Sequence, residues 1–160
     1  YPDHMITTEL LLLNFQEVRR RSIMIWQAVP EQWYPWKPDP EAESFIEVIR
    51  HVLECERLFH CRILNRGPVE GYLSPWAGRP YTNLADELAF ASPYRTEFLS
   101  LVQGFSNAEL ETIEIAGRGK TKSRKLGDYL LRAAYHESVH GGQILANLRA
   151  CRIDRPYIWD

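Results

Sequence analysis

The stretch of sequence that decides the fold is LGDYLLRAAYHESVHGGQILANLRAC, residues 126–151. Its apolar residues recur every three or four positions, which is the period of one face of an α-helix. A helix with one apolar stripe buries that stripe against other elements. The stretch therefore predicts a long helix packed on one side, with a stripe formed by Leu126, Leu130, Ala134, Ile144 and Leu148.

Three other stretches have the same helical period, and none shows the period-2 alternation of a half-buried strand. We expect these helices at about 7–29, 42–65 and 83–104, with Pro30 and Gly67 stopping the first two. Four helices of this length are typical of a helical bundle. The predicted fold class is therefore all-α, with the four helices forming one bundle.

Prolines and a short segment modify this plan locally. Pro93 lies within the third helix, where its missing N–H predicts a kink or a restart capped by Ser92. Residues 32–40 contain three prolines and predict a stiff, extended crossing after the first helix. Residues 111–115, between the third and fourth helices, are expected to be briefly extended.

Length, composition and charge predict one globular domain over residues 1–160. Apolar residues make up 45% and charged residues 25% of the chain, and no repeat or linker interrupts it. The formal net charge is −2, with acids and bases interspersed, so no nucleic acid is expected as a partner. The one basic cluster, 118–125, contains no aromatic residue and is expected to be a solvated loop.

The apolar runs and the cysteines bear on location. No apolar run approaches the roughly 18 residues that span a bilayer, so no membrane is expected as a partner. Cys55, Cys61 and Cys151 form no CxxC pair, and their odd number prevents complete pairing within the chain. This usage is typical of a reducing compartment, and we expect a cytoplasmic protein.

Two histidines of the last helix suit a metal ion. His136 and His140 are four residues apart, so both imidazoles project from one face about one turn apart. They lie beside the apolar stripe, at the interior edge of the bundle, and this spacing lets both reach one ion at about 2.1 Å. Alone the pair is a modest signal, because exposed or hydrogen-bonded histidines also occur at this spacing. His4 receives no role.

His51 strengthens the metal hypothesis. It lies at the edge of the apolar face of the second helix, as the pair does on the last helix. Two helices can thus supply three neutral nitrogen ligands and leave coordination positions for water or substrate, as in catalytic metal sites. Three unrelated histidines remain the alternative. His60 points about opposite to His51 and is expected on the surface.

Residues 136–140 also match the HExxH pattern of zinc proteases, in which the glutamate is the general base. The context disfavours a protease, because no histidine or glutamate follows His140 and no active-site strand is evident. Glu137 and Glu56 both lie near apolar stripes, where a lone carboxylate is costly. We expect each to pair with an arginine, or alternatively to orient a ligand histidine.

Three stretches carry a resemblance to a known family. They are SFIEVIRH at 44–51 with Glu56 after it, HESVHGGQI at 136–144, and LRACRIDRPYIW at 148–159. The second is the most specific, since paired histidines followed by Gly-Gln near a C-terminal helix are a hallmark of that family. The chain resembles the DinB/YfiT-like family of four-helix-bundle metalloproteins over nearly its whole length.

The resemblance implies a ligand set and an architecture. In that family the metal is held by one histidine of the second helix and two of the last, which correspond to His51, His136 and His140. The architecture implied is an up-and-down bundle with a long crossing after the first helix, often as a homodimer. The chain departs at Gly141, where many relatives have a histidine or a larger residue, and the small residue is expected to widen the site.

The relatives look like thiol-dependent S-transferases that use mycothiol, bacillithiol or glutathione, and one branch isomerises maleylpyruvate. Our leading hypothesis is a transferase in which a divalent ion, zinc or nickel, activates a low-molecular-weight thiol toward a small electrophile. No thiol-binding residue is identifiable. Arg149 and Arg152 are expected on the surface, with contact to an anionic cofactor as the alternative.

Two other functions stay open. A hydrolase would use metal-bound water on a small-molecule substrate, with Glu137 or Glu56 as the base. A metal-binding or stress-response protein without enzymatic activity would hold the ion in an inert site. Thiol-dependent activity favours the transferase, and thiol-independent ester or amide cleavage favours the hydrolase.

Overall fold

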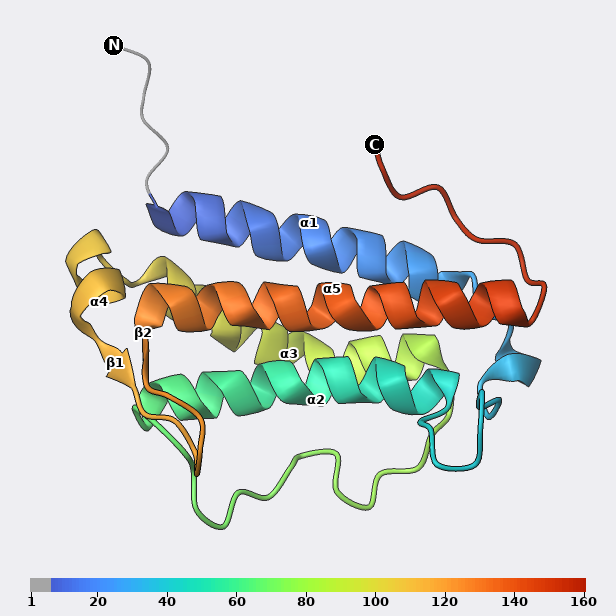
Figure 1. Cartoon of the computed structure of the whole chain (residues 1–160), viewed down its shortest axis with the longest axis horizontal. Helices are drawn as coiled ribbons and strands as arrows, with labels where there is room; N and C mark the ends of the chain where they lie inside the picture. Colours follow the sequence, from blue (N-terminus) through green and yellow to red (C-terminus); the bar gives the residue numbers. More distant parts are fainter. Residues whose placement is uncertain (1–6) are drawn as a thin grey trace.

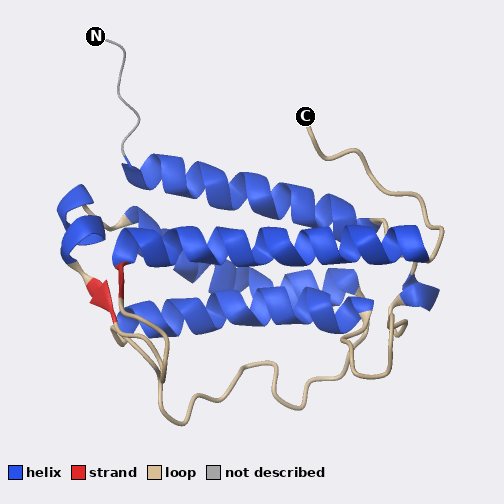
Figure 2. Ribbon diagram, viewed as in Figure 1, coloured by secondary structure: helices blue, strands red, loops and turns tan. Residues whose placement is uncertain are grey.

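The computed structural model describes residues 7–160 (Figures 1 and 2), so His4 lies outside the described residues. The all-α prediction is confirmed. One short helix, α4, and two strands of two residues accompany the four long helices. The helices are α1 (Thr7–Gln27), α2 (Phe45–Leu64), α3 (Leu84–Gln103), α4 (Asn107–Thr112) and α5 (Leu126–Ala150). None of those within residues 7–160 has the length and apolarity needed to cross a membrane.

Extended backbone occurs close to where it was expected. Strand β1 (Glu114–Ile115) pairs antiparallel with β2 (Arg124–Lys125), with Glu114 opposite Lys125. The prediction of an extended segment at 111–115 is therefore right for its last two residues. It is wrong at its start, because α4 continues to Thr112.

Helix α2 begins three residues later than expected, at Phe45. Ser44 caps it: the Ser44 hydroxyl accepts from the Glu47 N–H at 3.4 Å, and the Glu47 carboxylate accepts from the Ser44 N–H at 2.7 Å. This reciprocal capping box satisfies two backbone donors that the first turn leaves free. Ala42 therefore belongs to the turn that precedes the helix.

Helix α3 runs through Pro93 without a break, so the expected restart at Ser92 is wrong. Pro93 cannot donate to the Ala89 carbonyl one turn earlier. Ala89 and Pro93 are both exposed, so water can hydrogen-bond to that carbonyl. The helix begins where it was predicted, at Leu84, and Asn83 caps it with its side-chain oxygen, which accepts from the Asp86 N–H at 2.9 Å.

The four long helices occupy the corners of a bundle. Helices α3 and α5 each pack against both α1 and α2, so α1 and α2 lie at opposite corners. The segment 28–44 makes the long crossing between them, which confirms that expectation. The prediction that residues 32–40 are stiff and extended is wrong, because the segment contains a 3-10 turn at Glu31–Trp33 and further turns after it.

Helices α2 and α3 run in the same direction. Arg50 pairs with Glu87 near the start of both helices, and His60 lies beside Phe98 toward their ends. The connection 65–83 therefore returns along the whole length of the bundle, as Figure 1 shows. The four-helix bundle is present, and its helices do not strictly alternate in direction.

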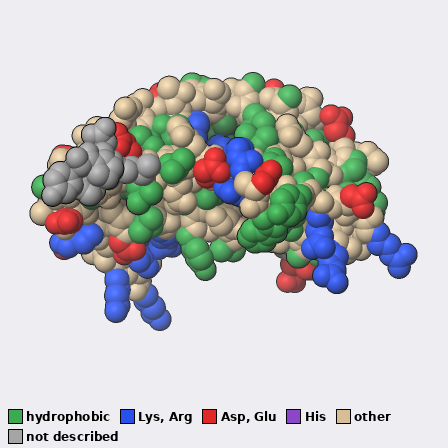
Figure 3. All heavy atoms as spheres, turned by 90° about the horizontal axis from the view of Figure 1, so that it is seen from above, with side chains coloured by type: hydrophobic (Ala, Val, Ile, Leu, Met, Phe, Trp, Pro, Cys, Tyr) green, Lys and Arg blue, Asp and Glu red, His purple; other side chains and the backbone are tan. Residues whose placement is uncertain are grey.

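The core consists of two apolar clusters. One surrounds Trp26, Phe45 and Ile49, and the other surrounds Phe15 and Phe98. The predicted stripe of α5 is buried along its whole length and contributes to both clusters. Viewed onto α1, no histidine side chain of the described residues shows on the molecular surface (Figure 3). His51, His136 and His140 lie on the side of the bundle formed by α2 and α5.

Candidate metal centre

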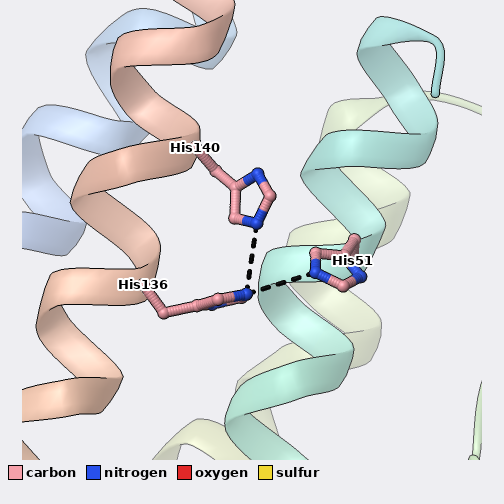
Figure 4. A group of neighbouring side chains, drawn as sticks. All are labelled: His51, His136 and His140. Carbon is pink, nitrogen blue, oxygen red and sulfur yellow. Dashed lines mark hydrogen bonds between the residues drawn. The ribbon is translucent and has the colours of Figure 1, made fainter. Parts of the chain in front are cut away.

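The structure brings together the three predicted ligands, His51 of α2 and His136 and His140 of α5. Figure 4 shows their rings converging between the two helices. The His136 Nε2 atom lies 3.2 Å from His51 Nε2 and 3.1 Å from His140 Nε2. One nitrogen from each ring lies within 4.8 Å of the others. Since all three residues are partly buried, the cluster keeps contact with solvent.

The donor set fits a divalent transition-metal ion. Two imidazole nitrogens bound at about 2.1 Å in tetrahedral geometry are about 3.4 Å apart, close to the separations observed here. Within residues 7–160, one group of three or more potential ligands lies close enough together to hold one ion, and it consists of these three histidines. The site therefore offers three protein ligands and leaves room in the coordination sphere.

The electrostatics keep His136 neutral. Burial, together with the nearby His140 and His51, lowers the pKa of His136 to about 4. Metal ions bind deprotonated imidazole, so protonation does not compete with a metal at this position near pH 7.

Gln143 orients one of the ligands. Its side-chain oxygen lies 2.9 Å from His140 Nδ1, at hydrogen-bond distance. A proton on Nδ1 that is donated to this oxygen leaves the Nε2 lone pair directed at the other histidines. Sequence reasoning assigned no role to Gln143. Its position three residues after His140 was the available signal, because such residues are neighbours on a helix surface.

His51 has looser support. Its Nδ1 lies 4.0 Å from a Glu43 carboxylate oxygen and 3.9 Å from Cys55 Sγ, both beyond a strong hydrogen bond. Glu56, one of the acceptors proposed for His51, instead pairs with Arg19 and Arg95. Burial raises the pKa of the neighbouring Cys55 thiol to about 11, so this thiol stays protonated at neutral pH.

Glu137 pairs with an arginine, as expected. Its two carboxylate oxygens accept hydrogen bonds of 2.7 and 3.0 Å from the Arg19 guanidinium. Burial acts to raise the pKa of Glu137, but the charge and hydrogen bonds of Arg19 outweigh it, and the pKa lies below the ordinary value. The carboxylate is thus directed at α1. A role for Glu137 as catalytic base stays a prediction.

The pair belongs to a larger arrangement that we call the charge network, with Arg19 of α1, Glu56 of α2, Arg95 of α3 and Glu137 of α5. Each long helix contributes one residue. Arg19 joins the two carboxylates, Arg95 pairs with Glu56, and Arg95 also donates to the Phe15 carbonyl at 2.9 Å. Every buried charge therefore has a partner of opposite sign.

His60 and Gly141 lie in environments other than those predicted. His60 is only 6% exposed, with its ring centroid 6.4 Å from that of Phe98, because α3 covers the face of α2 opposite His51. Burial lowers the pKa of His60. A Cβ on Gly141 would meet the Ile25 side chain at 3.4 Å and no atom of His51 or His136 within 4 Å. Gly141 therefore allows close packing of α5 on α1 and does not widen the metal centre.

The fold and the candidate site together define a class of protein. It is a four-helix bundle in which the second and the last long helices direct three imidazoles to one point, where a metal ion could bind. The sequence profile of the DinB superfamily matches residues 14–144, most of the chain. The chain belongs to the DinB superfamily.

A crystal structure of the DinB-like protein YjoA from Bacillus subtilis has a similar fold. It superposes with a TM-score of 0.67, covering 93% of this chain and 96% of that one at 17% sequence identity. At this identity the likeness shows the fold alone. No curated protein matches the chain.

Proposed function

We propose that the chain is a metal-dependent transferase that conjugates a low-molecular-weight thiol to small electrophiles. The observation that carries the proposal is the convergence of His51, His136 and His140, three partly buried side chains, between α2 and α5. Three neutral nitrogens hold a divalent ion firmly and leave a position for an exogenous ligand. Zinc and nickel are the proposed ions, because imidazole suits both.

The protein side chains in this proposal bind and orient. The histidines present their Nε2 lone pairs, and Gln143 fixes the ring of His140. A bound divalent ion supplies positive charge that lowers the pKa of a thiol beside it. The thiol sulfur then bonds to an electrophilic carbon, the leaving group departs with its electron pair, and the thiol proton passes to solvent.

The test is a conjugation assay with a panel of thiols and one electrophile, monobromobimane, on metal-loaded and chelator-treated protein. We expect acceleration by the loaded protein alone, and loss of acceleration in His136→Ala. Tyr135→Ala, a change of an exposed residue on the same turn of α5, serves as the matched control. Equal rates with and without chelator would refute the transferase. Thiol-independent, metal-dependent ester cleavage would assign a hydrolase in its place.

The homodimer implied by the family resemblance stays a prediction. Leu10 and Leu13 of α1 and Leu131 of α5 are each more than two-fifths exposed and line an apolar groove of about 680 Å³. A second copy of the chain would remove this apolar surface from water. Sedimentation equilibrium measures the mass in solution, and a monomer at all concentrations would contradict the expectation.

A further inference from the structure

A small cavity lies where the end of α2, the start of α5 and the loop 116–123 meet. Its volume is about 60 Å³. A water molecule needs about 10–15 Å³ of such space, so several waters or one oxyanion would fit. The loop joins β1 to β2, and the Ala116 N–H donates to the Arg66 carbonyl at 2.9 Å, which holds the loop against the end of α2.

The walls of this cavity carry positive charge. They include five cationic side chains and no carboxylate, and the cationic residues are Arg62, Arg118, Lys122, Arg124 and Arg132. Of these five residues, Arg124 alone forms an ion pair within the described part of the chain, with Asp128 at 2.8 Å. Lys and Arg side chains project from this end of the molecule, left in Figure 3. Like charges gathered around a hollow attract an anion from solution.

A buried hydroxyl provides a second, independent observation. Tyr129 is 7% exposed and lines the cavity, and its buried hydroxyl proton has no acceptor, although the Arg62 guanidinium lies close enough to donate to the hydroxyl oxygen. The Nε of Arg124 is buried and has no acceptor either. Buried polar groups in folded proteins nearly always have partners, so two such donors beside one hollow indicate that the partner is a bound ligand.

We propose that this cavity binds the oxyanion group, phosphate or carboxylate, of a small-molecule ligand. Arginine guanidinium groups match such oxyanions with paired, charge-assisted hydrogen bonds. Arg62, in the last turn of α2, and Arg132, in the second turn of α5, face the hollow from its two helical walls. The Tyr129 hydroxyl, also on α5, donates to the same anion.

The cavity lies on the same side of α5 as the histidine cluster. Tyr129 precedes His136 by seven residues on α5, so both lie on one face about 10 Å apart along the axis. Phe59 of α2 bridges them, with ring centroids 5.7 Å from Tyr129 and 5.7 Å from His136. This second part rests on the proposed function: the cavity would hold the anionic end of the thiol whose sulfur reaches the metal centre.

Titration of the metal-loaded protein with inorganic phosphate and with acetate, followed by calorimetry, tests the anion site. Arg62→Gln and Arg132→Gln should each weaken binding about tenfold, because each removes charge-assisted hydrogen bonds. Arg149→Gln, an exposed arginine at the other end of α5, is the control and should bind as the parent does. The stronger of the two anions identifies the group. Absence of binding by the parent, or equal weakening in the control, would overturn the proposal.

Tyr129→Phe removes only the hydroxyl. Without ligand it should melt at or above the temperature of the parent, because an unsatisfied buried group is lost. With phosphate present it should gain less thermal stability than the parent gains. An equal gain in both proteins would show that the hydroxyl does not contact the anion and would overturn that contact.

Two measurements keep this inference separable from the proposed function. The His136→Ala/His140→Ala variant should lose metal and still bind phosphate; loss of both would overturn an independent anion site. In the conjugation assay, Arg132→Gln should raise KM severalfold for glutathione, which is anionic, and leave it unchanged for uncharged mercaptoethanol. Equal changes in KM for both thiols would refute the idea that one thiol occupies both the cavity and the metal centre. Absence of conjugation with intact phosphate binding would refute only the transferase.

Discussion

Two polar clusters lie next to each other inside this bundle and differ in what completes them. In the charge network every charged group has a partner within the chain, and the network joins all four long helices. The histidine cluster joins two helices, and its Nε2 atoms lie against one another, 3.2 and 3.1 Å apart, with no group of opposite charge among the described residues bound to any of the three. A polar cluster satisfied by the chain serves the fold, whereas one left unsatisfied indicates an external partner.

The largest expected effect tests the structural side of this comparison. Arg19→Met should lower the free energy of unfolding by about 3–5 kcal/mol, because it leaves two buried carboxylates without their shared partner. Urea denaturation measures the loss. Arg20→Met, a neighbouring change at an exposed ion pair, should cost about 0–1 kcal/mol. Equal effects of the two changes would mean that the charge network does not hold the helices together.

The next effect tests the metal side. His51→Ala should weaken metal affinity more than about a hundredfold, a larger loss than changes outside the ligand set produce. Circular dichroism should show nearly unchanged helix content, since His51 lies at a partly exposed edge. Metal content after dialysis against a weak chelator is the measurement. Parental affinity in this variant would remove His51 from the ligand set and leave the assignment without its third nitrogen.

A smaller effect is expected at Gln143. Removal of its acceptor in Gln143→Ala frees the ring of His140, and metal affinity should fall about tenfold. Gln143→Glu should restore it, because a carboxylate accepts the same Nδ1 proton. Competition with a chromogenic chelator would report both constants. Similar affinities for Gln143→Ala and the parent would show that His140 needs no orienting partner.

The smallest effect concerns pH. The pKa of His136 is about 4 in the fold, below the value near 6.5 of an unperturbed histidine. Between about pH 6.5 and pH 4 the unfolded chain binds a proton at His136 and the folded chain does not. The free energy of unfolding is therefore fully retained above about pH 6.5 and decreases as the pH falls toward 4. Metal-free protein should lose on the order of 1 kcal/mol more than His136→Gln between about pH 7 and pH 5. Parallel losses in urea melts would place the acid sensitivity elsewhere.

Much of the fold was predictable from periodicity. The apolar stripe of α5 is buried as its spacing indicated, and the two helices that carry the histidines lie side by side. The direction of α3 was not predictable, because the segment 65–83 is long enough to turn back at once or to return along the bundle. Tertiary contacts between α2 and α3, such as those of Arg50 with Glu87 and of His60 with Phe98, select the second path.

The environment of single side chains was the harder problem. Arg19, Arg20 and Arg21 are consecutive, and no local pattern tells that the first alone is buried against Glu137. His60 was predicted on the surface because the sequence identifies only one apolar face of α2. In the bundle, two faces of this helix are covered by other helices. Residues 118–123 of the basic cluster form a solvated loop as expected, whereas Arg124 and Lys125 form β2. The contribution of the cluster to a cavity over Tyr129 depends on how the β1–β2 pair places it.

The order of the helices along the chain sets when the histidine cluster can exist. His51 and His136 are separated by 85 residues. At a translation rate of about 5–20 residues per second, roughly 4–17 s pass between their synthesis. A metal ion that meets the growing chain in that interval finds His51 alone among the three ligands. The complete cluster therefore forms only after the last helix has been synthesised, so an ion that needs all three histidines would bind the finished bundle and would not guide its early assembly.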